Sequence, residues 1–201
     1  SCIVARDRQK KSVVFPIFEN KHTNHILDFT VVPARIDAPV KDRASQTALA
    51  IAEALDLVGL LTVEFFVGTG RDGRLGLFVN ELAPRVHNSG HVTRQCCAVS
   101  QFDVSARILM NAPLHQPELR PGGWAMGQLL GDVWLAQGRS SGAIDLTAWA
   151  NFPEVIEIYL YGKKEARSAR KMGHFIVHAP TADLAEQRAI DFRNALMRQA
   201  P

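Results

Sequence analysis

The segments LLTVEFFV (residues 60–67) and LGLFVNE (residues 75–81) decide the fold, because both are dominated by the β-branched, aromatic and aliphatic side chains typical of strands. Between them lies GTGRDGR (residues 68–74), in which the dipeptide Asp72-Gly73 is a strong signal for a tight turn. The sequence therefore predicts an antiparallel hairpin.

The predicted hairpin brings two acidic residues together. With the turn centred on Asp72-Gly73, Arg71 pairs with Arg74 and Glu64 lies opposite Glu81. Opposed carboxylates repel each other, and a divalent cation would turn that repulsion into attraction. Oxygen ligands favour Mg²⁺ over Zn²⁺, and Mg²⁺ usually keeps water and phosphate oxygens in its shell. Glu64 and Glu81 are thus candidate metal ligands. The alternative is that the polar faces of the strands simply carry glutamate.

A polar loop, Ala83–His91, follows the second strand and carries Arg85, His87 and Asn88. Catalytic groups often lie on such irregular loops. Arg85 has the planar geometry to hold a carboxylate-like anion with two hydrogen bonds. Ser89 is placed to cap a following helix, whose free N–H groups would also attract an anion. The alternative is an ordinary capped loop with solvated charges.

Four residues in this region raise a zinc site as a further alternative: His87, His91, Cys96 and Cys97. On a helix, neighbouring side chains point about 100° apart, so the two thiols would diverge. Cys96 also falls on the apolar stripe of the predicted helix, where packing as a small hydrophobe explains it better. No Gly-x-Ser-x-Gly segment supports a nucleophilic triad.

A basic run near the end, residues 163–174, contains five Lys or Arg residues and one Glu. It joins two predicted strands, residues 154–161 and 174–179, so it is expected to be a loop. Such a loop is suited to holding a phosphate. A solvated loop and a nucleic-acid patch remain alternatives, although no aromatic residues are interleaved for stacking on bases.

The composition places the protein among ordinary globular chains. The 201 residues are 47% hydrophobic and 21% charged, with a net charge of +3. These values exclude a disordered or low-complexity protein, and no apolar run reaches the roughly 20 residues that span a bilayer. The three cysteines do not form a disulfide framework, which favours a reducing, cytoplasmic setting.

The order of the elements predicts an α+β protein in two parts. A larger part covers residues 1–112, a linker rich in Pro and Gly covers 113–123, and a small α+β part covers 124–201. The predicted strands are 2–6, 12–18, 28–33, 60–67, 75–81, 124–130, 154–161 and 174–179. The predicted helices are 44–58 (capped by Asp42 or Ser45), 92–110, and one after Thr181 with Ala185, Ala189, Phe192 and Leu196 facing inward.

The stretch NELAPRVHNSGH (residues 80–91) closely resembles the signature of the N5-carboxyaminoimidazole ribonucleotide synthases, ATP-grasp enzymes of de novo purine synthesis. Three further stretches match in the same order along nearly the whole chain: Phe15-Pro16 with residues 19–22, then residues 100–102, then RSARKMGH at residues 167–174. The resemblance implies the C-terminal half of an ATP-grasp domain (residues 1–112) followed by a small α+β C-terminal domain.

The family carboxylates 5-aminoimidazole ribonucleotide with bicarbonate, converting ATP to ADP and phosphate. The resemblance implies that ATP first phosphorylates bicarbonate to carboxyphosphate, and that the amine then captures the carboxyl group or the CO₂ released from it. It further implies ATP and Mg²⁺ as cofactors, 5-aminoimidazole ribonucleotide and bicarbonate as partners, and a cytoplasmic homodimer of the full-length enzyme, with neither nucleic acid nor membrane involved.

The resemblance also assigns roles at the nucleotide. Glu64 and Glu81 would hold Mg²⁺ on the ATP phosphates, and Asn80 would help line that site. Glu19 falls where the family contacts the nucleotide.

The remaining roles concern anions. By resemblance, Arg85, His87 and Asn88 would hold bicarbonate or carboxyphosphate. Lys163 and Arg170 would grip the phosphate of the ribonucleotide.

The chain departs from the family in two respects. Ser168-Ala169 stands where the family usually has Pro-Gly, and the Rossmann-like domain and glycine-rich ATP loop of the family are not in these residues. We therefore expect a C-terminal portion that is inactive alone. The alternatives are another ATP-grasp carboxylate–amine ligase, or a non-catalytic nucleotide- or RNA-binding module that uses the loop 163–171.

Overall fold

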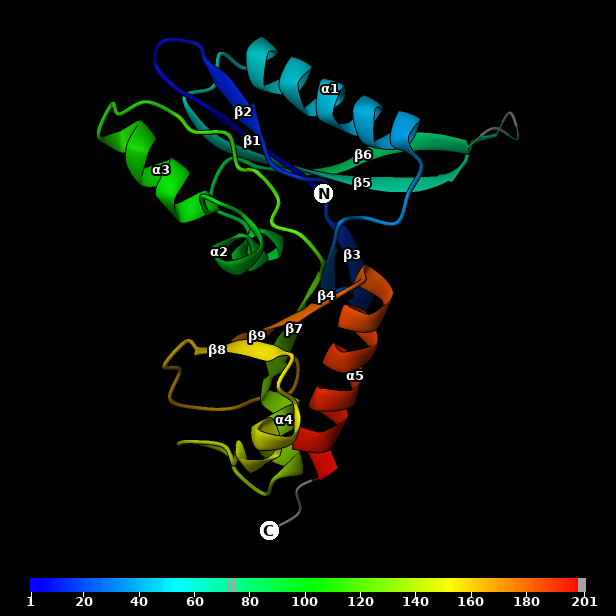
Figure 1. Ribbon diagram of the computed structural model, residues 1–201, viewed down its shortest axis with the longest axis vertical. Helices are drawn as coiled ribbons and strands as arrows, with labels where there is room; N and C mark the ends of the chain where they lie inside the picture. Colours follow the sequence, from blue (N-terminus) through cyan, green and yellow to red (C-terminus); the bar gives the residue numbers. More distant parts are fainter. Residues whose placement is uncertain (72, 74, 199–201) are drawn as a thin grey trace. The chain divides into compact units, whose positions relative to one another are not determined.

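The computed structural model describes residues 1–71, 73 and 75–198, without the side chain of Leu75. The chain divides into two compact units (Figure 1). The first comprises Ser1–Glu19 and Pro33–Arg120, and the second comprises Asn20–Val32 and the chain from Pro121 onward. The segment Asn20–Val32 thus groups with the C-terminal unit, whereas the sequence division assigned it to the larger N-terminal part.

The first unit is built on a four-stranded antiparallel sheet. The strands in order are β2 (Ser12–Val14), β1 (Cys2–Arg6), β5 (Gly59–Thr69) and β6 (Leu75–Ala83). Helix α1 (Ala38–Ala54) covers one face (Figure 1). Ala48 and Ala52 pack there against Cys2, Leu61 and Val63, and all five are at most 1% exposed. Small alanines let the helix approach the sheet closely.

Helix α1 does not begin where the sequence predicted. It starts at Ala38 after Asp37, with a proline in its first turn, so the expected caps Asp42 and Ser45 lie inside the helix. It ends at Ala54, and Asp56 takes a left-handed backbone conformation (φ 43°) shortly after it. The predicted range of 44–58 was therefore displaced toward the C-terminus.

The predicted helix 92–110 was wrong, because the chain breaks there into three short pieces. These are η1 (Asn88–Val92), α2 (Thr93–Cys96) and α3 (Gln101–Leu109). Cys97 is extended and pairs with Leu119, and a capping box then starts α3. In that box, the Asp103 N–H donates to Ser100 Oγ, while the Ser100 N–H donates to Asp103.

The β5–β6 hairpin is one residue out of the predicted register close to its turn. Phe65 pairs with Val79 instead of Asn80, and the shift persists to the end of the hairpin. A β-bulge between Glu64 and Phe65 then restores the register, so that Glu64 pairs with Glu81 as predicted. The proposed turn residue Asp72 and the Arg71–Arg74 pair fall outside the described residues, because Asp72 and Arg74 are not described.

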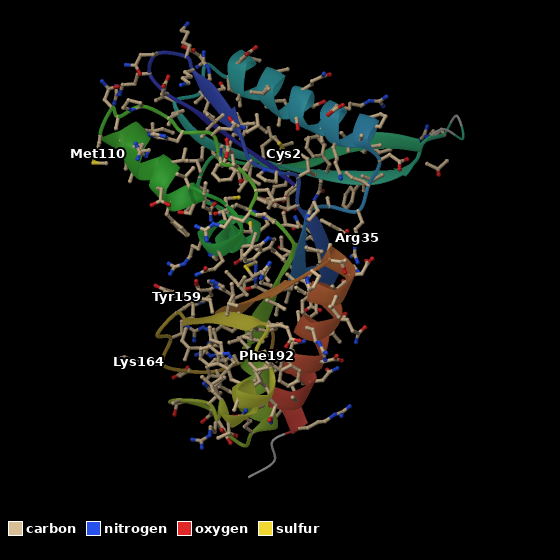
Figure 2. All side chains as sticks on the ribbon, viewed as in Figure 1. Cys2, Arg35, Met110, Tyr159, Lys164 and Phe192 are labelled. Atoms are coloured by element: carbon tan, nitrogen blue, oxygen red, sulfur yellow. The ribbon has the colours of Figure 1, made fainter. Side chains whose placement is uncertain are left out.

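The second unit contains a five-stranded sheet and one long helix. The strands in order are β3 (Glu19–Thr23), β4 (Ile26–Val32), β7 (Gly123–Leu130), β9 (Lys171–Ala179) and β8 (Val155–Leu160). Helix α5 (Ala182–Arg198) packs on this sheet with Ala185, Ala189, Phe192 and Leu196 fully buried, as predicted (Figure 2). The sequence missed β3, the short helix α4 (Gly131–Ala136) and η2 (Thr147–Asn151). In the part of the chain that is described, no helix has the length and apolar character needed to cross a membrane.

We expect Ser100→Ala to destabilise the first unit by about 1 kcal/mol, because it removes an N-cap. The Ser100 side-chain hydrogen bond also lowers the pKa of Asp103 below its ordinary value. A carboxyl with a lowered pKa stabilises the fold above its unfolded pKa and loses that effect as the pH falls. The difference between the two proteins in urea denaturation should therefore shrink in acid. Ser105→Ala, inside the same helix, is the control and should cost nothing.

Candidate functional site

The acidic pair lies where the sequence placed it. Glu64 and Glu81 are direct partners across β5 and β6, and residues so paired project from the same face of a sheet. The side chain of Glu64 is 12% exposed, whereas Glu81 is open to solvent. Asn80 is also exposed and sits next to Glu81, on the strand that carries the extra residue of the bulge. Two carboxylates and an amide oxygen therefore lie together at this irregularity.

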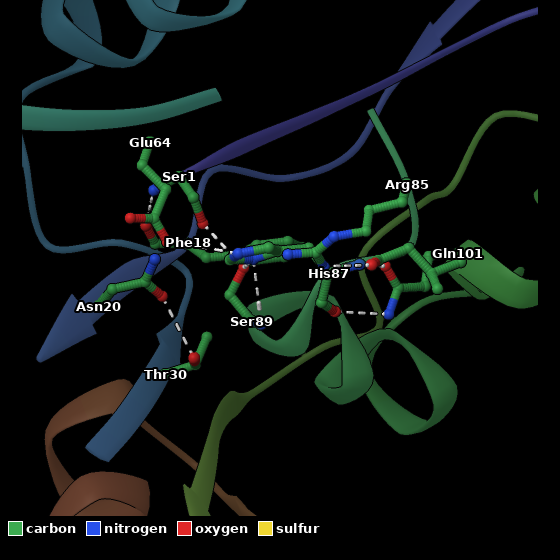
Figure 3. Close-up of polar contacts among 10 residues, drawn as sticks. Ser1, Phe18, Asn20, Thr30, Glu64, Arg85, His87, Ser89 and Gln101 are labelled. Atoms are coloured by element: carbon green, nitrogen blue, oxygen red, sulfur yellow. Dashed lines mark hydrogen bonds and ion pairs between the residues drawn. The ribbon is translucent and has the colours of Figure 1, made fainter. Parts of the chain in front are cut away.

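His87 connects this carboxylate pair to the loop after β6. Its Nε2 atom lies 3.5 Å from Glu64 Oε1, and its Nδ1 atom lies 2.9 Å from Ser89 Oγ (Figure 3). The ring is buried, and Nδ1 also accepts from the Ser89 N–H at the start of η1. Both ring nitrogens are therefore engaged, which fixes the orientation of the imidazole.

Gln101 holds the same loop from the first residue of α3 (Figure 3). Its Oε1 accepts from the backbone N–H of His87 at 2.9 Å, and its Nε2 donates to the backbone carbonyl of His87 at 2.8 Å. Nε2 also lies 3.1 Å from Nδ1 of His91. A single fully buried amide thus satisfies both backbone groups of His87.

Gly90 shows how tightly this loop packs. A Cβ atom on Gly90 would lie 2.4 Å from Gln101 Oε1 and 2.5 Å from Cδ1 of Ile3. Real Cβ atoms essentially never come this close, so a larger residue at this position would require the side chains of Gln101 and Ile3 to move. The loop therefore rests directly on the face of the sheet opposite α1.

Gln101 is not among the functional residues predicted from the sequence, although the sequence carries a signal for it. Gln101 lies on the buried stripe of α3 with Val104 and Ile108, and a polar residue on such a stripe needs hydrogen-bond partners. Its partners are backbone groups 14 residues earlier, which no local pattern reveals.

Arg85 and Asn88 lie on either side of His87 with different surroundings. Arg85 is exposed, and its Nη1 donates to the Val86 carbonyl at 3.0 Å. Nδ2 of Asn88 is buried and lacks a hydrogen-bond partner among the described residues. An unsatisfied buried donor costs about 1–3 kcal/mol, and such groups in native proteins call for an explanation such as a ligand or water.

Glu19 is already engaged in a strong ion pair. Arg35 donates to it through Nε at 2.8 Å and through Nη2 at 2.6 Å, and its backbone N–H adds a third bond. This bidentate arrangement fixes the carboxylate of Glu19 at the beginning of β3.

Lys163 and Arg170 belong to the loop between β8 and β9 in the second unit. Lys163 Nζ donates to the carbonyl of Lys171 at 2.6 Å, and Arg170 Nη1 donates to the carbonyl of Glu165 at 2.9 Å. The carboxylate of Glu165 pairs with Arg167 at 2.6 Å. Backbone carbonyls thus fix the positions of Lys163 and Arg170. The acidic side chain of the loop, that of Glu165, forms its ion pair with a different arginine, Arg167.

The zinc alternative finds no support. The predicted divergence of the two thiols was wrong, because α2 ends at Cys96 and Cys97 is extended, which leaves the buried sulfur atoms 3.6 Å apart. His87 and His91 are held by the loop contacts described above. Among the described residues, no group of three or more His, Cys, Asp or Glu side chains is placed to bind a metal ion.

Two family models match this chain. One, described as the ATP-grasp domain, matches residues 1–102, and the other, the phosphoribosylaminoimidazole carboxylase C-terminal domain, matches residues 125–188. The chain belongs to the ATP-grasp family. Within that family its relatives are N5-carboxyaminoimidazole ribonucleotide synthases, which confirms the resemblance seen in residues 80–91.

Two relatives illustrate the likeness. The enzyme of Bacillus subtilis is 39% identical over 178 residues, and that of Brucella melitensis is 40% identical over 174 residues. Each match covers 87% of this chain, but only 42% and 44% of those proteins. The chain thus spans less than half the length of these two curated relatives.

Solved structures agree with the predicted α+β architecture. The ADP complex of one such synthetase superposes with a TM-score of 0.82 at 35% identity, covering 98% of this chain and 49% of the other. An Aspergillus clavatus enzyme in complex with ADP and 5-aminoimidazole ribonucleotide gives 0.74 at 29% identity, covering 98% and 51%. The predicted fold class is confirmed.

We expect Gln101→Leu to destabilise the first unit by about 1–3 kcal/mol or more, because it leaves the buried N–H and carbonyl of His87 without partners. Urea denaturation measures the loss. Gln46→Leu, on the exposed side of α1, is the control and should stay within about 0.5 kcal/mol of the parent. Equal stability of the two variants would show that Gln101 does not hold the loop.

Proposed function

We propose that this sequence is the C-terminal portion of an N5-carboxyaminoimidazole ribonucleotide synthase, which carboxylates 5-aminoimidazole ribonucleotide with bicarbonate at the expense of ATP. The observation that carries the proposal is the direct pairing of Glu64 with Glu81 in a chain whose relatives are these synthases. From the resemblance to these synthases we also propose that the full-length enzyme is cytoplasmic and homodimeric. Because the chain covers only 42% and 44% of the two relatives, we propose that the 201-residue chain is inactive alone.

The residues at the bulge fit Mg²⁺ bound to ATP. Glu64 and Glu81 offer hard oxygen ligands on one face of the sheet, and phosphate oxygens and water would fill the other positions. When bound, the metal would neutralise negative charge on the phosphates during phosphoryl transfer. Asn80 would line this site, and Glu19, oriented by Arg35, would contact the nucleotide.

The loop after β6 fits bicarbonate and carboxyphosphate. Arg85 offers an exposed guanidinium, which binds carboxylate-like anions with paired hydrogen bonds. The buried, unsatisfied Nδ2 of Asn88 offers a further donor from the same loop. His87, held between Glu64 and Ser89, would keep the anion next to the metal ligands. Positive and donor groups fixed around developing charge are the main catalytic device of phosphoryl transfer.

The loop of the second unit fits the phosphate of the ribonucleotide. Lys163 and Arg170 provide two cations whose positions are set by backbone carbonyls. Arginine and lysine together suit a phosphate, since the first grips it with a planar fork and the second acts as a point charge.

In the full-length enzyme that carries this sequence, Glu81→Gln should abolish ATP turnover dependent on Mg²⁺, since one anionic metal ligand is lost while the exposed side chain keeps its shape. ADP release in the presence of bicarbonate and 5-aminoimidazole ribonucleotide measures the effect. Glu53→Gln, on the exposed face of α1, is the control. Normal turnover by the Glu81 variant would contradict the metal role.

Lys163→Ala should raise the KM for the ribonucleotide by roughly tenfold with little change in kcat, because a phosphate contact made equally in ground and transition states is removed. Lys164→Ala, its neighbour on the same loop, is the matched control. Equal KM values for the two variants would leave the basic loop as a solvated surface. Salt-sensitive RNA binding by the loop, unaffected by Mg²⁺ and ATP, would favour a nucleic-acid module instead.

A further inference from the structure

The loop that carries Lys163 and Arg170 is held to the rest of the second unit at more than one place. In its middle, Ala166 donates its backbone N–H to the carbonyl of Ser140 at 2.8 Å and Glu165 pairs with Ser141, and its last residues meet the start of α4. Strands β7 and β9 end their pairing at Leu130 and Lys171, and the residues just beyond the pair remain in contact. Gly131 donates its backbone N–H to the carbonyl of Arg170 at 2.8 Å. The loop therefore meets the start of α4 immediately before β9 begins.

Asp132, the next residue, accepts two hydrogen bonds from the turn of the loop. Its Oδ1 accepts from Ser168 Oγ at 2.7 Å, and its Oδ2 accepts from the backbone N–H of Ala169 at 2.8 Å. Burial raises the pKa of Asp132, but the bonds from Ser168 and Ala169 outweigh it and lower the pKa below its ordinary value. The carboxylate thus stays ionised as an acceptor at neutral pH.

The turn needs such an anchor because its backbone is strained. Ala169 has a φ of 64°, the left-handed region that L-residues other than glycine enter at a cost of about 1–2 kcal/mol. Asp132 binds the N–H of the strained residue itself. Arg170 follows directly, so the conformation of Ala169 sets the direction in which Arg170 leaves the turn.

Gly131 allows the backbone of the loop to pack directly against the start of α4. A Cβ atom on Gly131 would lie 2.2 Å from the carbonyl oxygen of Arg167 and 2.7 Å from its nitrogen. Both atoms are backbone, so any larger residue would displace the loop. Arg170 in turn donates its N–H to that same Arg167 carbonyl at 3.1 Å, which closes the turn.

We propose that Asp132 is a positioning residue for phosphate binding: its carboxylate holds Ser168 and Ala169 so that Arg170 is presented to the phosphate of the ribonucleotide. This inference rests on the proposed function of the loop. In this proposal Asp132 acts through the turn, by its hydrogen bonds to Ser168 and Ala169. Lys164, on the same loop (Figure 2), has no part in it.

The test compares ribonucleotide KM and kcat in the full-length enzyme. Asp132→Asn should raise KM by roughly tenfold with kcat nearly unchanged, because a charge-assisted hydrogen bond to the turn is lost. Ser168→Ala, which removes one of the two contacts, should raise KM by a smaller factor. Asp191→Asn, on α5, is the matched control and should leave KM unchanged.

A second substitution separates positioning from general stabilisation. Ala169→Gly permits the left-handed conformation without strain, so adding it to Asp132→Asn should return the raised KM most of the way to the parent value. A purely structural role for Asp132 would lower both stability and kcat, and Ala169→Gly would not restore KM.

The outcomes distinguish this inference from the function on which it rests. If Arg170→Ala leaves KM unchanged, the phosphate site and the positioning role fail together. If Arg170→Ala raises KM while Asp132→Asn does not, the phosphate site stands and the positioning role alone is overturned. The inference is supported if Arg170→Ala and Asp132→Asn both raise the KM for the ribonucleotide and Ala169→Gly lowers it again in the Asp132→Asn background.

Discussion

Two carboxylates on neighbouring strands repel each other, and the first unit nevertheless holds Glu64 opposite Glu81. At the spacing of opposed side chains, about 5 Å, that repulsion is of the order of 1–3 kcal/mol for effective dielectric constants between water and a protein surface. A β-bulge beside Glu64 imposes the pairing, since the register of the outer hairpin would place Glu64 opposite a different residue. A bound cation, as proposed above, would turn this repulsion into attraction.

The loop after β6 is organised around this pair. His87 reaches Glu64 from the loop, and Gln101 fixes the backbone of His87 from α3. Gly90 lets the loop lie against β1 without a side chain in the way. Because each contact depends on the next, the position of the imidazole is set by elements well separated along the sequence. Arg85, which is exposed, and Asn88, whose Nδ2 is buried and unsatisfied, are the residues of this loop proposed above to hold an anion.

The sequence predicted what depends on local pattern and missed what depends on distant partners. The hairpin and its acidic pair followed from strand composition and an Asp-Gly turn, even though the outer register was one residue off. The helix predicted from spacing alone is interrupted from Cys97 and begins again after Ser100. The capping box of Ser100 with Asp103 is visible in the sequence, but it competes there with an uninterrupted apolar stripe. The pairing of Asn20–Val32 with the second unit and the role of Gln101 depend on tertiary contacts, so no single-sequence pattern encodes them.

The two loops proposed to bind anions are held by different chemistry, and burial explains the difference. Gln101 is fully buried, and a neutral amide can offer a donor and an acceptor there without the desolvation cost of a charge. Asp132 is only partly buried, so an ionised carboxylate is tolerated and can accept two bonds from Ser168 and Ala169. The carboxylate of Asp132, a stronger acceptor than an amide, binds the N–H of Ala169. The backbone of Ala169 is strained, whereas that of His87 is not. Each loop is therefore anchored by the side chain that its solvent exposure permits.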